Sequence, residues 1–535
     1  PRRVCSSDLS NAADPHGVLQ HQQHDQQALR LTEAQRAVAQ LVSRGTSLFL
    51  TGPAGTGKSQ LLQSISNVGG PTIAMTAMTG SAAVLLQGQT LHAWAGIGQA
   101  EDEAEVLAAK VLQDASSYSR WRSTSLLIID EVSMMSAVLL DKLDFVGRKV
   151  RGRPSQPLGG LQVLLSGDFH QLPPPSVRKE GWAFEAKCWK KLIPVTAELT
   201  EVLRLDPEER DFARLLCQVR RGRLDEEAWA LLTSRRLPPS VEESVWCREL
   251  RRASHLVSTN AEADKVNSIK LANLATRPEV KGGVGFSRDP ITFWAVAASP
   301  GGFDHAGSGR PPANNAIPLE LPLAVGATVV LTHSLSVGAN YERWTNGARA
   351  MVVGFSQISA RLFDPKCVVS GLSEIEPGAL LPKPVRRFLE RHYGVLPRLA
   401  LLPEADGAAD EENDEQEEER EREEEEGTSS GHVIYPMVSG HGSDTKVQLP
   451  LRLGWALTVH RAQGMTLDSC VVHLDRISNS GQAYVAMSRV RRASSLWITG
   501  KLPQRSPTTG HVVAFAPAKE VRDFYDRLED DADDA

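Results

Sequence analysis

The segment SLFLTGPAGTGKSQLLQSIS (47–66) constrains the fold more than any other part of the chain. A short apolar run typical of a buried strand leads into a glycine-rich loop, and the loop opens a helix-like stretch. The loop, GPAGTGKS (52–59), has the spacing G-x-x-x-x-G-K-[ST], in which backbone N–H groups and a helix N-terminus surround phosphate oxygens. The sequence therefore predicts an α/β domain that binds a nucleotide.

Each position of this loop has an expected role. Lys58 would reach the β- and γ-phosphates of ATP, and Ser59 would hold Mg²⁺. The residues expected to contact the nucleotide are Gly52, Pro53, Ala54, Gly55, Thr56, Gly57, Lys58 and Ser59.

Further strands are predicted at 71–77, 125–131 and 161–168, with helical patterns between them. Strands that alternate with helices indicate a doubly wound parallel sheet, whose ligands bind beyond the carboxyl ends of the strands. The unusual polar residues of this region stand at those ends.

Two acids close the strand LLIIDE, where Asp130 would bind Mg²⁺ through water and Glu131 would activate or orient the attacking water. Adjacent acids at a strand end can also be simple surface residues. The combination with a phosphate-binding loop favours an ATP hydrolase over a small-molecule kinase, because the kinase has its own acceptor as nucleophile.

The stretch LLSGDFHQLPPP (164–175) places Gln171 just past the end of another strand. One interpretation is a turn that merely needs polar residues. The other is a sensor, because an amide donates and accepts at once and would feel the γ-phosphate or its attacking water. The prolines that follow fix φ and hold the next segment extended.

Charge is distributed unevenly. The whole chain carries −6, but residues 404–426 hold fifteen acids and two arginines, and 529–534 add five acids. With both segments set aside the net charge is +12, which suits a phosphate-backbone partner. Such acidic blocks repel themselves and are expected to be unfolded.

Other bulk features exclude several classes of protein. No apolar run approaches the length of a membrane span, and the first residues lack the apolar region of a secretory signal. The six cysteines lie far apart without a CxxC, which argues against a zinc ribbon or a disulfide framework. Because residue 1 is not methionine, we interpret the chain as a fragment, which leaves room for an upstream targeting segment.

Several blocks resemble the motifs of the petite-integration-frequency (Pif-type) DNA helicases of superfamily one. GDFHQLPP resembles motif III, LTEAQ (31–35) the adenine-reading Q motif, and the stretch 77–98 motifs Ia and Ib. The stretches 199–222, 453–475 and 481–492 resemble motifs IV, V and VI. The resemblance implies that Gln35 reads adenine, that Gly464 contacts the nucleotide, and that Arg204 and Arg489 are arginine fingers from the second α/β domain. Leu205 and Ala350 depart from the family pattern.

The resemblance also implies DNA contacts, made by Thr79, Gly80, His92, Thr259, Asn260, Thr458, His460 and Gln463. Small hydroxyl and amide groups near strand ends suit phosphate and sugar contacts, which carry no sequence information. His92 and Trp94 would stack on bases. Alternatively, Trp94 belongs to the core and a threonine only caps a helix.

The expected fold is α/β, with two RecA-like P-loop NTPase domains and a small β-rich, SH3-like insertion in the second. The predicted parts are a disordered N-terminus (1–28), domain 1A (29–198), domain 2A (199–275 and 441–515), the insertion 2B (276–440) with a disordered acidic loop (404–431), and an acidic C-terminal tail (516–535).

The expected function is that of an ATP- and Mg²⁺-dependent DNA helicase or translocase, moving five-prime to three-prime on single-stranded DNA in repair, recombination, replication or telomere maintenance. Expected partners are single-stranded and duplex or fork DNA, with G-quadruplex or RNA–DNA hybrid as further substrates, and the motor is expected to be monomeric and to bind no membrane. The expected compartment is intracellular: the nucleus or mitochondrion in a eukaryote, the cytoplasm otherwise. Two alternatives stay open, the helicase region of a rolling-circle mobile-element protein and an ATP-regulated DNA-binding remodeller without strand separation.

Overall fold

The computed structural model divides the chain into two compact units. The first holds residues 1–246, 462–465 and 469–535, and the second holds 247–461 and 466–468. The described residues are 2–4, 31–69, 72–206, 208–237, 250, 253–275, 290–299, 302–305, 319–333, 335–337, 342–344, 348–357, 368–369, 379–380, 383–392, 395–402, 431–439, 446–474, 477 and 481–533. Residues 404–430 of the predicted acidic loop lie outside this set, and the predicted domain boundaries stay predictions.

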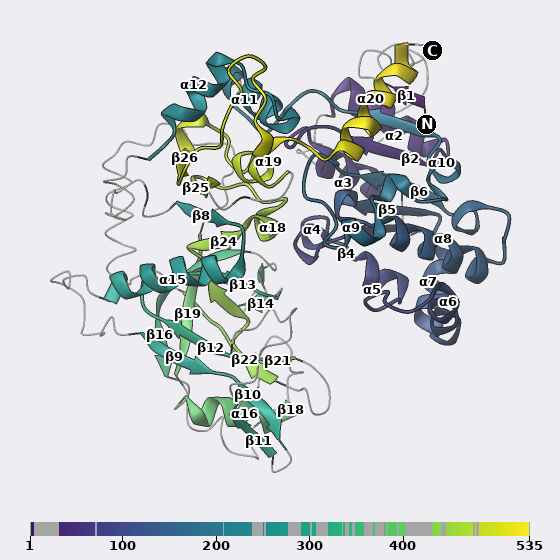
Figure 1. The fold of residues 1–535 in the computed structure, drawn as a ribbon. Coiled ribbons are helices and arrows are strands. Elements are labelled where there is room, and N and C mark those ends of the chain that lie inside the picture. The colour runs from purple at the N-terminus through teal and green to yellow at the C-terminus, as the bar shows by residue number, and fades with distance from the viewer. Residues whose placement is uncertain are drawn as a thin grey trace, which may run out of the picture. The chain divides into compact units, whose positions relative to one another are not determined.

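A parallel sheet forms the centre of the first unit, with strand order β1-β7-β2-β6-β5-β3-β4 (Figure 1). Its strands are β1 (Arg2–Val4), β2 (Leu48–Thr51), β3 (Ile73–Ala77), β4 (Gln89–Thr90), β5 (Leu126–Asp130), β6 (Gln162–Ser166) and β7 (Val195–Glu198). All four strands predicted in this region are confirmed. Residues 2–4 were expected to be disordered, but they form β1, because the exposed edge of β7 offers backbone partners to an extended segment.

Helices surround this sheet and continue through the later parts of the unit. They are α2 (Glu33–Ser43), α3 (Lys58–Gly69), α4 (Gly80–Leu85), α5 (Leu91–Ala95), α6 (Ala104–Gln113), α7 (Ala115–Ser123), α8 (Ala137–Arg151), α9 (Val177–Glu180), α10 (Trp189–Leu192), α11 (Arg210–Arg221), α12 (Glu226–Ser234), α19 (Gln482–Met487) and α20 (Lys519–Asp533). The unit also contains a second parallel pair, β25 (Cys470–His473) with β26 (Leu496–Thr499).

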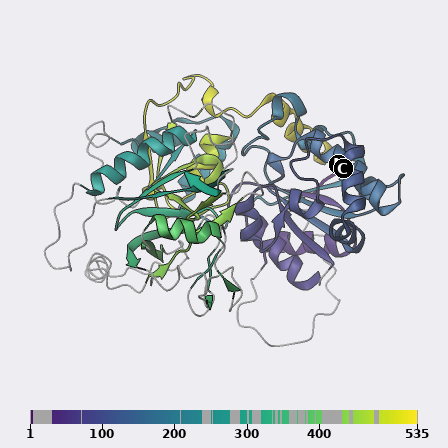
Figure 2. The same ribbon diagram turned by 90° about the horizontal axis from the view of Figure 1, so that it is seen from below.

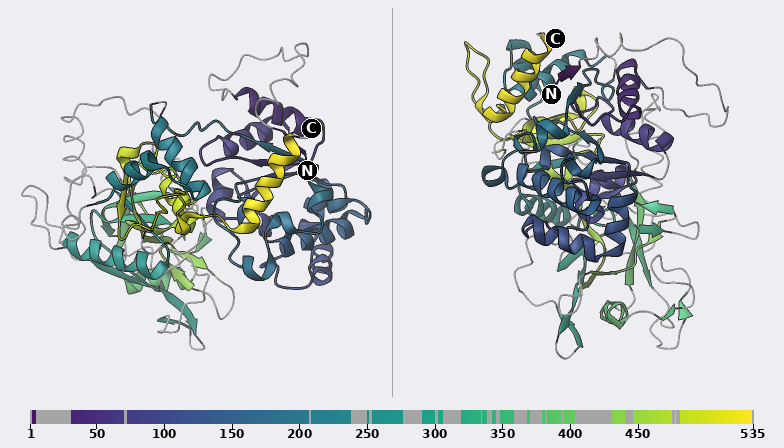
Figure 3. Two further views of the ribbon diagram at one scale, coloured as in Figure 1. Left: turned by 45° about the horizontal axis from the view of Figure 1, so that its top comes forward. Right: turned by 90° about the vertical axis from the view of Figure 1, so that its right-hand side faces the viewer.

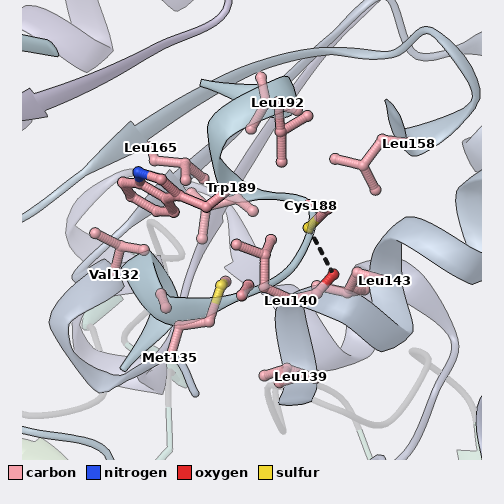
Figure 4. Close-up of a cluster of buried hydrophobic side chains, with 14 of the residues drawn as sticks. Val132, Met135, Leu139, Leu140, Leu143, Leu158, Leu165, Cys188, Trp189 and Leu192 are labelled. Carbon is pink, nitrogen blue, oxygen red and sulfur yellow. Dashed lines mark hydrogen bonds between the residues drawn. The ribbon is translucent and has the colours of Figure 1, made fainter. Parts of the chain in front are cut away.

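One large core lies between the first sheet and helices α8 and α10. Leu165 from β6, Leu140 and Leu143 from α8, and Trp189 from α10 are all buried within it (Figure 4). The Cys188 thiol, also buried, lies 3.9 Å from the Leu140 carbonyl oxygen, and burial raises the pKa of this thiol. This cysteine forms no disulfide.

The C-terminal segment contradicts the sequence-based expectation of an unfolded acidic tail. Residues 519–533 form α20, which lies beside β1 in the first unit (Figures 1 and 3). Val521, Phe524, Tyr525 and Leu528 stand on one face of this helix and are buried, so the acids point to solvent. The net charge of this segment is a misleading guide to its structure. Burial of the apolar residues at helical spacing contributes more free energy to folding than repulsion between the exposed acids costs.

The second unit contains one parallel pair, β8 (Ser254–Val257) with β24 (Ala456–Thr458), and a long helix, α15 (Asn260–Ala275). Helix α18 (Val459–Ala462) follows β24 directly. Strand β8 leads into helix α15.

The rest of the second unit is rich in antiparallel strands, coloured teal to green in Figure 2. They are β9 (Ile291–Trp294), β10 (Val296–Ser299), β11 (Gly302–His305), β12 (Glu320–Leu323), β13 (Thr328–Leu331), β14 (Leu335–Val337), β15 (Glu342–Trp344), β16 (Arg349–Gln357), β17 (Val368–Val369), β18 (Ala379–Leu380), β19 (Val395–Leu401), β20 (His432–Val433), β21 (Met437–Ser439), β22 (Lys446–Gln448) and β23 (Leu451–Leu453), with helix α16 (Lys383–Arg391). The predicted β-rich insertion is confirmed, while its likeness to an SH3-like module stays a prediction. Among the residues described, no helix is long and apolar enough to cross a membrane.

Candidate active site

The phosphate-binding loop joins β2 to α3 and closes tightly on its neighbours. Gly55 has φ +86°, and a Cβ at this position would lie 2.6 Å from the Cβ of Arg204, so both the conformation and the space require glycine. The loop carbonyl of Gly55 accepts hydrogen bonds from the N–H groups of Leu203 (2.7 Å) and Arg204 (3.0 Å). The segment after β7 therefore lies directly against the loop.

Lys58 is held inside this loop. Its ammonium group donates to the carbonyl oxygens of Gly52 (2.8 Å) and Pro53 (2.9 Å). Burial lowers the pKa of Lys58, and the nearby negative charges of Asp168, Glu131 and Asp130 act in the opposite direction. A cation in this position is suited to an anionic ligand of the loop.

Two expected metal ligands meet at the ends of α3 and β5. The Ser59 hydroxyl donates to Asp130 Oδ2 (3.1 Å), while Ser166 donates to Asp130 Oδ1 (2.7 Å). No group of three His, Cys, Asp or Glu side chains that would hold a metal occurs in the described part of the chain. The Ser59–Asp130 pair fits Mg²⁺, which commonly takes one or two carboxylates and completes its shell with water and substrate phosphates.

Glu131 stands in a strained conformation. Its φ of 55° lies in the left-handed region, which is uncommon for a residue with a side chain. Burial, followed by the charge of Asp130, raises the pKa of Glu131 to about 7. This pKa places the carboxyl near the midpoint of its titration at neutral pH.

Gln463 has a partner that the sequence did not suggest. We expected it among the DNA contacts, but its amide nitrogen donates to Glu131 Oε2 at 2.7 Å, and its side chain is buried. The structure thus places Gln463 beside the carboxylate of Glu131. Gly464, the expected nucleotide contact beside it, has φ +85° and lies near Leu85.

The turn after β6 contains a buried charge pair. Arg220 donates to both carboxylate oxygens of Asp168, each at 2.9 Å. Burial acts to raise the pKa of Asp168, but Arg220 and the bond from His170 outweigh it and hold the pKa well below its ordinary value. Burial and the charge of Arg220 lower the pKa of His170 to about 4, so its ring is neutral at physiological pH.

Gln171 completes this turn, because its N–H donates to the Asp168 carbonyl oxygen at 2.9 Å. Its side chain is buried. Gly481, which precedes α19, has φ +80°, and a Cβ there would lie 2.2 Å from the Gln171 carbonyl oxygen. The predicted sensor therefore packs against the start of the helix that leads to Arg489.

Arg489 is fully buried and held by neutral acceptors. Its guanidinium donates to the carbonyl oxygens of Val485 (2.7 Å) and Met465 (3.3 Å) and to the Ser488 hydroxyl (2.8 Å). Burial and the neighbouring charge of Arg204 lower the pKa of Arg489 to about 9, and the charge of Glu131 acts to raise it.

Arg204 lies at the same site. It donates to the Ser488 carbonyl oxygen at 2.9 Å, and burial lowers its pKa while Tyr484 and Glu131 act to raise it. Both predicted arginine fingers therefore lie close enough to Glu131 to feel its charge, and Arg204 also packs against Gly55 of the loop. Their positive charges, so close together, favour an anion between them.

Tyr484 was not predicted as a site residue. Its hydroxyl oxygen accepts a hydrogen bond of 2.7 Å from the backbone N–H of Ala54, inside the phosphate-binding loop. The sequence signal for Tyr484 was its position in the block GQAYVAMSRVRR (481–492), five residues before the predicted finger Arg489.

Gln35 supports the loop from α2. Its amide nitrogen donates to the carbonyl oxygens of Thr56 (3.3 Å) and Gly57 (3.4 Å), and its oxygen accepts from the Thr32 N–H (2.9 Å). The structure therefore gives Gln35 a role in holding the loop, and adenine reading stays a prediction.

The predicted DNA contacts of the first unit lie beyond β3 and β4. Thr79 accepts from the Ala82 N–H (3.2 Å) at the start of α4, where Gly80 is the first residue, and His92 is half-buried on α5. Trp94 is core: it is 2% exposed and its ring centroid lies 4.7 Å from that of Trp121. The expectation that Trp94 stacks on bases is wrong, because α5 turns the indole toward α7.

The predicted DNA contacts of the second unit lie at one end of its parallel strand pair, β8 and β24. Thr458 pairs with Val257 in register, so the residues after β8 and β24 lie at the same end of the two strands. Thr259 accepts from the Glu262 N–H (3.3 Å) and caps α15, whose first residue, Asn260, is exposed. Burial lowers the pKa of the half-buried His460, so its ring is neutral at physiological pH.

Comparisons with known proteins agree with this geometry. Residues 30–229 match the PIF1-like helicase family. The chain is 33% identical over 470 residues to the ATP-dependent DNA helicase PIF1 of Homo sapiens, covering 87% of this chain and 60% of that protein. It is 29% identical over 542 residues to the ATP-dependent DNA helicase RRM3 of Saccharomyces cerevisiae, covering 96% and 69%.

The fold has solved relatives as well. The crystal structure of Pif1 helicase from Candida albicans aligns with a TM-score of 0.69 at 27% identity, covering 94% of this chain and 99% of that one. The chain spans 60% of the length of the human relative that it matches. The parallel α/β sheets, the loop with its two arginines and these similarities relate the chain to the PIF1-like helicases, whose family model matches residues 30–229 and whose solved structures share its fold.

Proposed function

We propose that this chain is an ATP-dependent DNA helicase or translocase. The observation that carries the proposal is one cluster in which Lys58 lies inside the phosphate-binding loop and the carboxyl of Glu131 feels the charges of both Lys58 and Arg489, two cations that suit an anionic ligand. The relation to the PIF1-like helicases supports the same conclusion. The chain spans only part of its curated relatives, so its activity and substrates are proposed here and are to be tested on this chain.

Hydrolysis would begin with the nucleotide in the loop. The loop N–H groups and Lys58 would bind its phosphates, while Ser59 and Asp130 would hold Mg²⁺. The ion, when bound, supplies charge that neutralises the phosphate oxygens. Glu131, with a pKa of about 7, is suited to take a proton from the attacking water, since a general base works best near the operating pH.

The two arginines would stabilise the charge that develops on the transferred phosphoryl group. Their neutral acceptors leave their charge uncompensated, so an anion gains more from them than from arginines already paired with carboxylates. Gln171 would report the state of the phosphate to α19 through the close contact at Gly481. Alternation of these contacts during the ATP cycle would drive stepping along a strand.

Single-stranded and fork DNA are the proposed substrates. The net charge of +12 outside the two acidic segments suits a polyanion. Thr79, Thr259 and His460 supply groups suited to phosphate and sugar contacts. The proposal also includes movement from five-prime to three-prime and activity on G-quadruplex or RNA–DNA hybrids. It further includes a monomeric motor and, in a eukaryote, a nuclear or mitochondrial location.

One experiment tests the proposal. Phosphate release is measured with and without single-stranded DNA, and unwinding is measured on forks that carry only a five-prime or only a three-prime tail. We expect DNA-stimulated ATPase and unwinding of the five-prime-tailed substrate, both lost in Lys58→Ala. ATPase without strand separation on either fork would support the remodeller instead, and no ATPase at all would refute the proposal.

A further inference from the structure

The C-terminal helix α20 reaches the same site from the other end of the chain. Phe524 stacks on Phe184 with ring centroids 4.3 Å apart and meets Phe169 edge-on at 5.5 Å. Phe169 belongs to the turn after β6, between Asp168 and His170. The helix is therefore anchored on the turn that carries the predicted phosphate sensor.

Tyr525, the next residue of α20, joins two strand ends through one hydroxyl group. Its oxygen lies 2.8 Å from Thr51 Oγ1, the last residue of β2, and it accepts a bond of 3.2 Å from the Phe169 N–H. Its hydroxyl donates to Asp168 Oδ1 at 3.4 Å. A phenol has one donor and two acceptor sites, so all three are used if Thr51 donates to it.

The ring of Tyr525 makes a second set of contacts with the same turn. Its centroid lies 4.5 Å from that of His170, and the Arg220 guanidinium carbon lies 5.5 Å from the ring centre. Burial and the charge of Asp168 raise the pKa of Tyr525, which keeps the phenol protonated and able to donate. Tyr525 thus contacts both members of the buried Asp168–Arg220 pair.

These contacts connect the two functional strand ends directly. Thr51 precedes the phosphate-binding loop, and Asp168 and Phe169 precede Gln171. The Tyr525 hydroxyl makes hydrogen bonds both to Thr51 and to the turn. A small displacement of one strand end against the other would move Gln171 relative to the loop.

We propose that Tyr525 is a positioning residue for ATP hydrolysis, which fixes the turn at 168–171 relative to the phosphate-binding loop. The C-terminal helix is then part of the ATPase and not an appendage. This inference rests on the proposed function, since it concerns the rate of the hydrolysis proposed above.

The test replaces Tyr525 by Phe, which removes only the hydroxyl and keeps the ring on His170. We expect kcat for ATP in saturating single-stranded DNA to fall about tenfold or more, because displacement of catalytic groups by a fraction of an ångström slows chemistry strongly. KM for ATP should change less than about twofold, because the loop that binds the phosphates is intact.

Leu528→Ala is the matched control. Leu528 is buried on the same helix, 3% exposed, and its apolar side chain cannot hydrogen-bond to Asp168 or Thr51. It should lower the thermal unfolding temperature at least as much as Tyr525→Phe while leaving kcat near wild type. If Leu528→Ala slowed hydrolysis as much as Tyr525→Phe, helix stability and not the hydroxyl would be responsible, and the inference would fail.

A second variant tests the bridge itself. Thr51→Val removes the other hydroxyl, so the double variant with Tyr525→Phe should be no slower than the slower single variant. Losses that multiply would show that the two groups act independently and would overturn the inference. An inactive wild-type chain would refute the proposed function, whereas a wild-type rate in Tyr525→Phe, with an active parent, would refute this inference alone.

Discussion

Replacing Glu131 by Gln should stabilise the protein at high pH while strongly slowing its ATP hydrolysis. Burial and Asp130 raise the pKa of Glu131 to about 7 from an ordinary 4.5. The folded state therefore binds a proton more tightly than the unfolded state, so the contribution of Glu131 to stability is full below pH 4.5 and is lost as pH rises toward 7. Gln keeps the left-handed backbone strain and an oxygen for the Gln463 amide, so it isolates the charge.

The magnitude follows from the size of the shift. The rise in the pKa of Glu131 from 4.5 to about 7 lowers the free energy of unfolding by about 3 kcal/mol above pH 7, relative to the protonated form. Because part of the Glu131 side chain keeps contact with solvent, this is an upper value. Relative to wild type, Glu131→Gln should gain about 1 kcal/mol at pH 5 and up to about 3 kcal/mol at pH 8.

Two assays check this prediction. Denaturation midpoints of wild type and Glu131→Gln are compared from pH 5 to pH 8, with Glu105→Gln on the exposed surface of α6 as the control for removal of one negative charge. Phosphate release should fall by about 10² to 10⁴ in Glu131→Gln, as expected for loss of a general base. A stability difference between the two proteins that stayed constant with pH would refute the assignment of a raised pKa.

Four further predictions concern the same machinery. Lys58→Ala should abolish ATP turnover; phosphate release near the wild-type rate would refute the interpretation of residues 52–59 as the loop that binds the phosphates of ATP. Gln171→Ala should keep nucleotide binding but lose the stimulation of ATPase by single-stranded DNA, and an unchanged ratio of rates with and without DNA would exclude a sensor. Arg489→Lys should lower kcat by about 10³ with little change in nucleotide affinity, because the planar guanidinium is lost while the charge stays; an unchanged kcat would argue against a finger. Deletion of 404–426 should leave ATPase intact, and a collapse of folding measured by circular dichroism would show that this segment is structural.

The nucleotide site was predictable from the sequence because its parts are local patterns at strand ends. Four strands of the first sheet, β2, β3, β5 and β6, were visible as apolar runs, and Lys58, Asp130 and Gln171 stand at the end of such a run or within a few positions of it. In a parallel sheet the carboxyl ends of neighbouring strands meet, so Lys58, Asp130 and Gln171 had to lie close together. Family resemblance added the two arginines, whose position no local pattern specified.

Other features needed the tertiary structure, because they depend on partners far away in the chain. Nothing in the sequence around Gln463 specifies Glu131 as its partner, and nothing around Trp94 specifies Trp121. The C-terminal segment was misjudged because its acids were counted while its apolar face had no visible place to pack. Only the folded chain brings Tyr525 within hydrogen-bond distance of Thr51, 474 residues earlier, since burial of an apolar face depends on the surface that receives it.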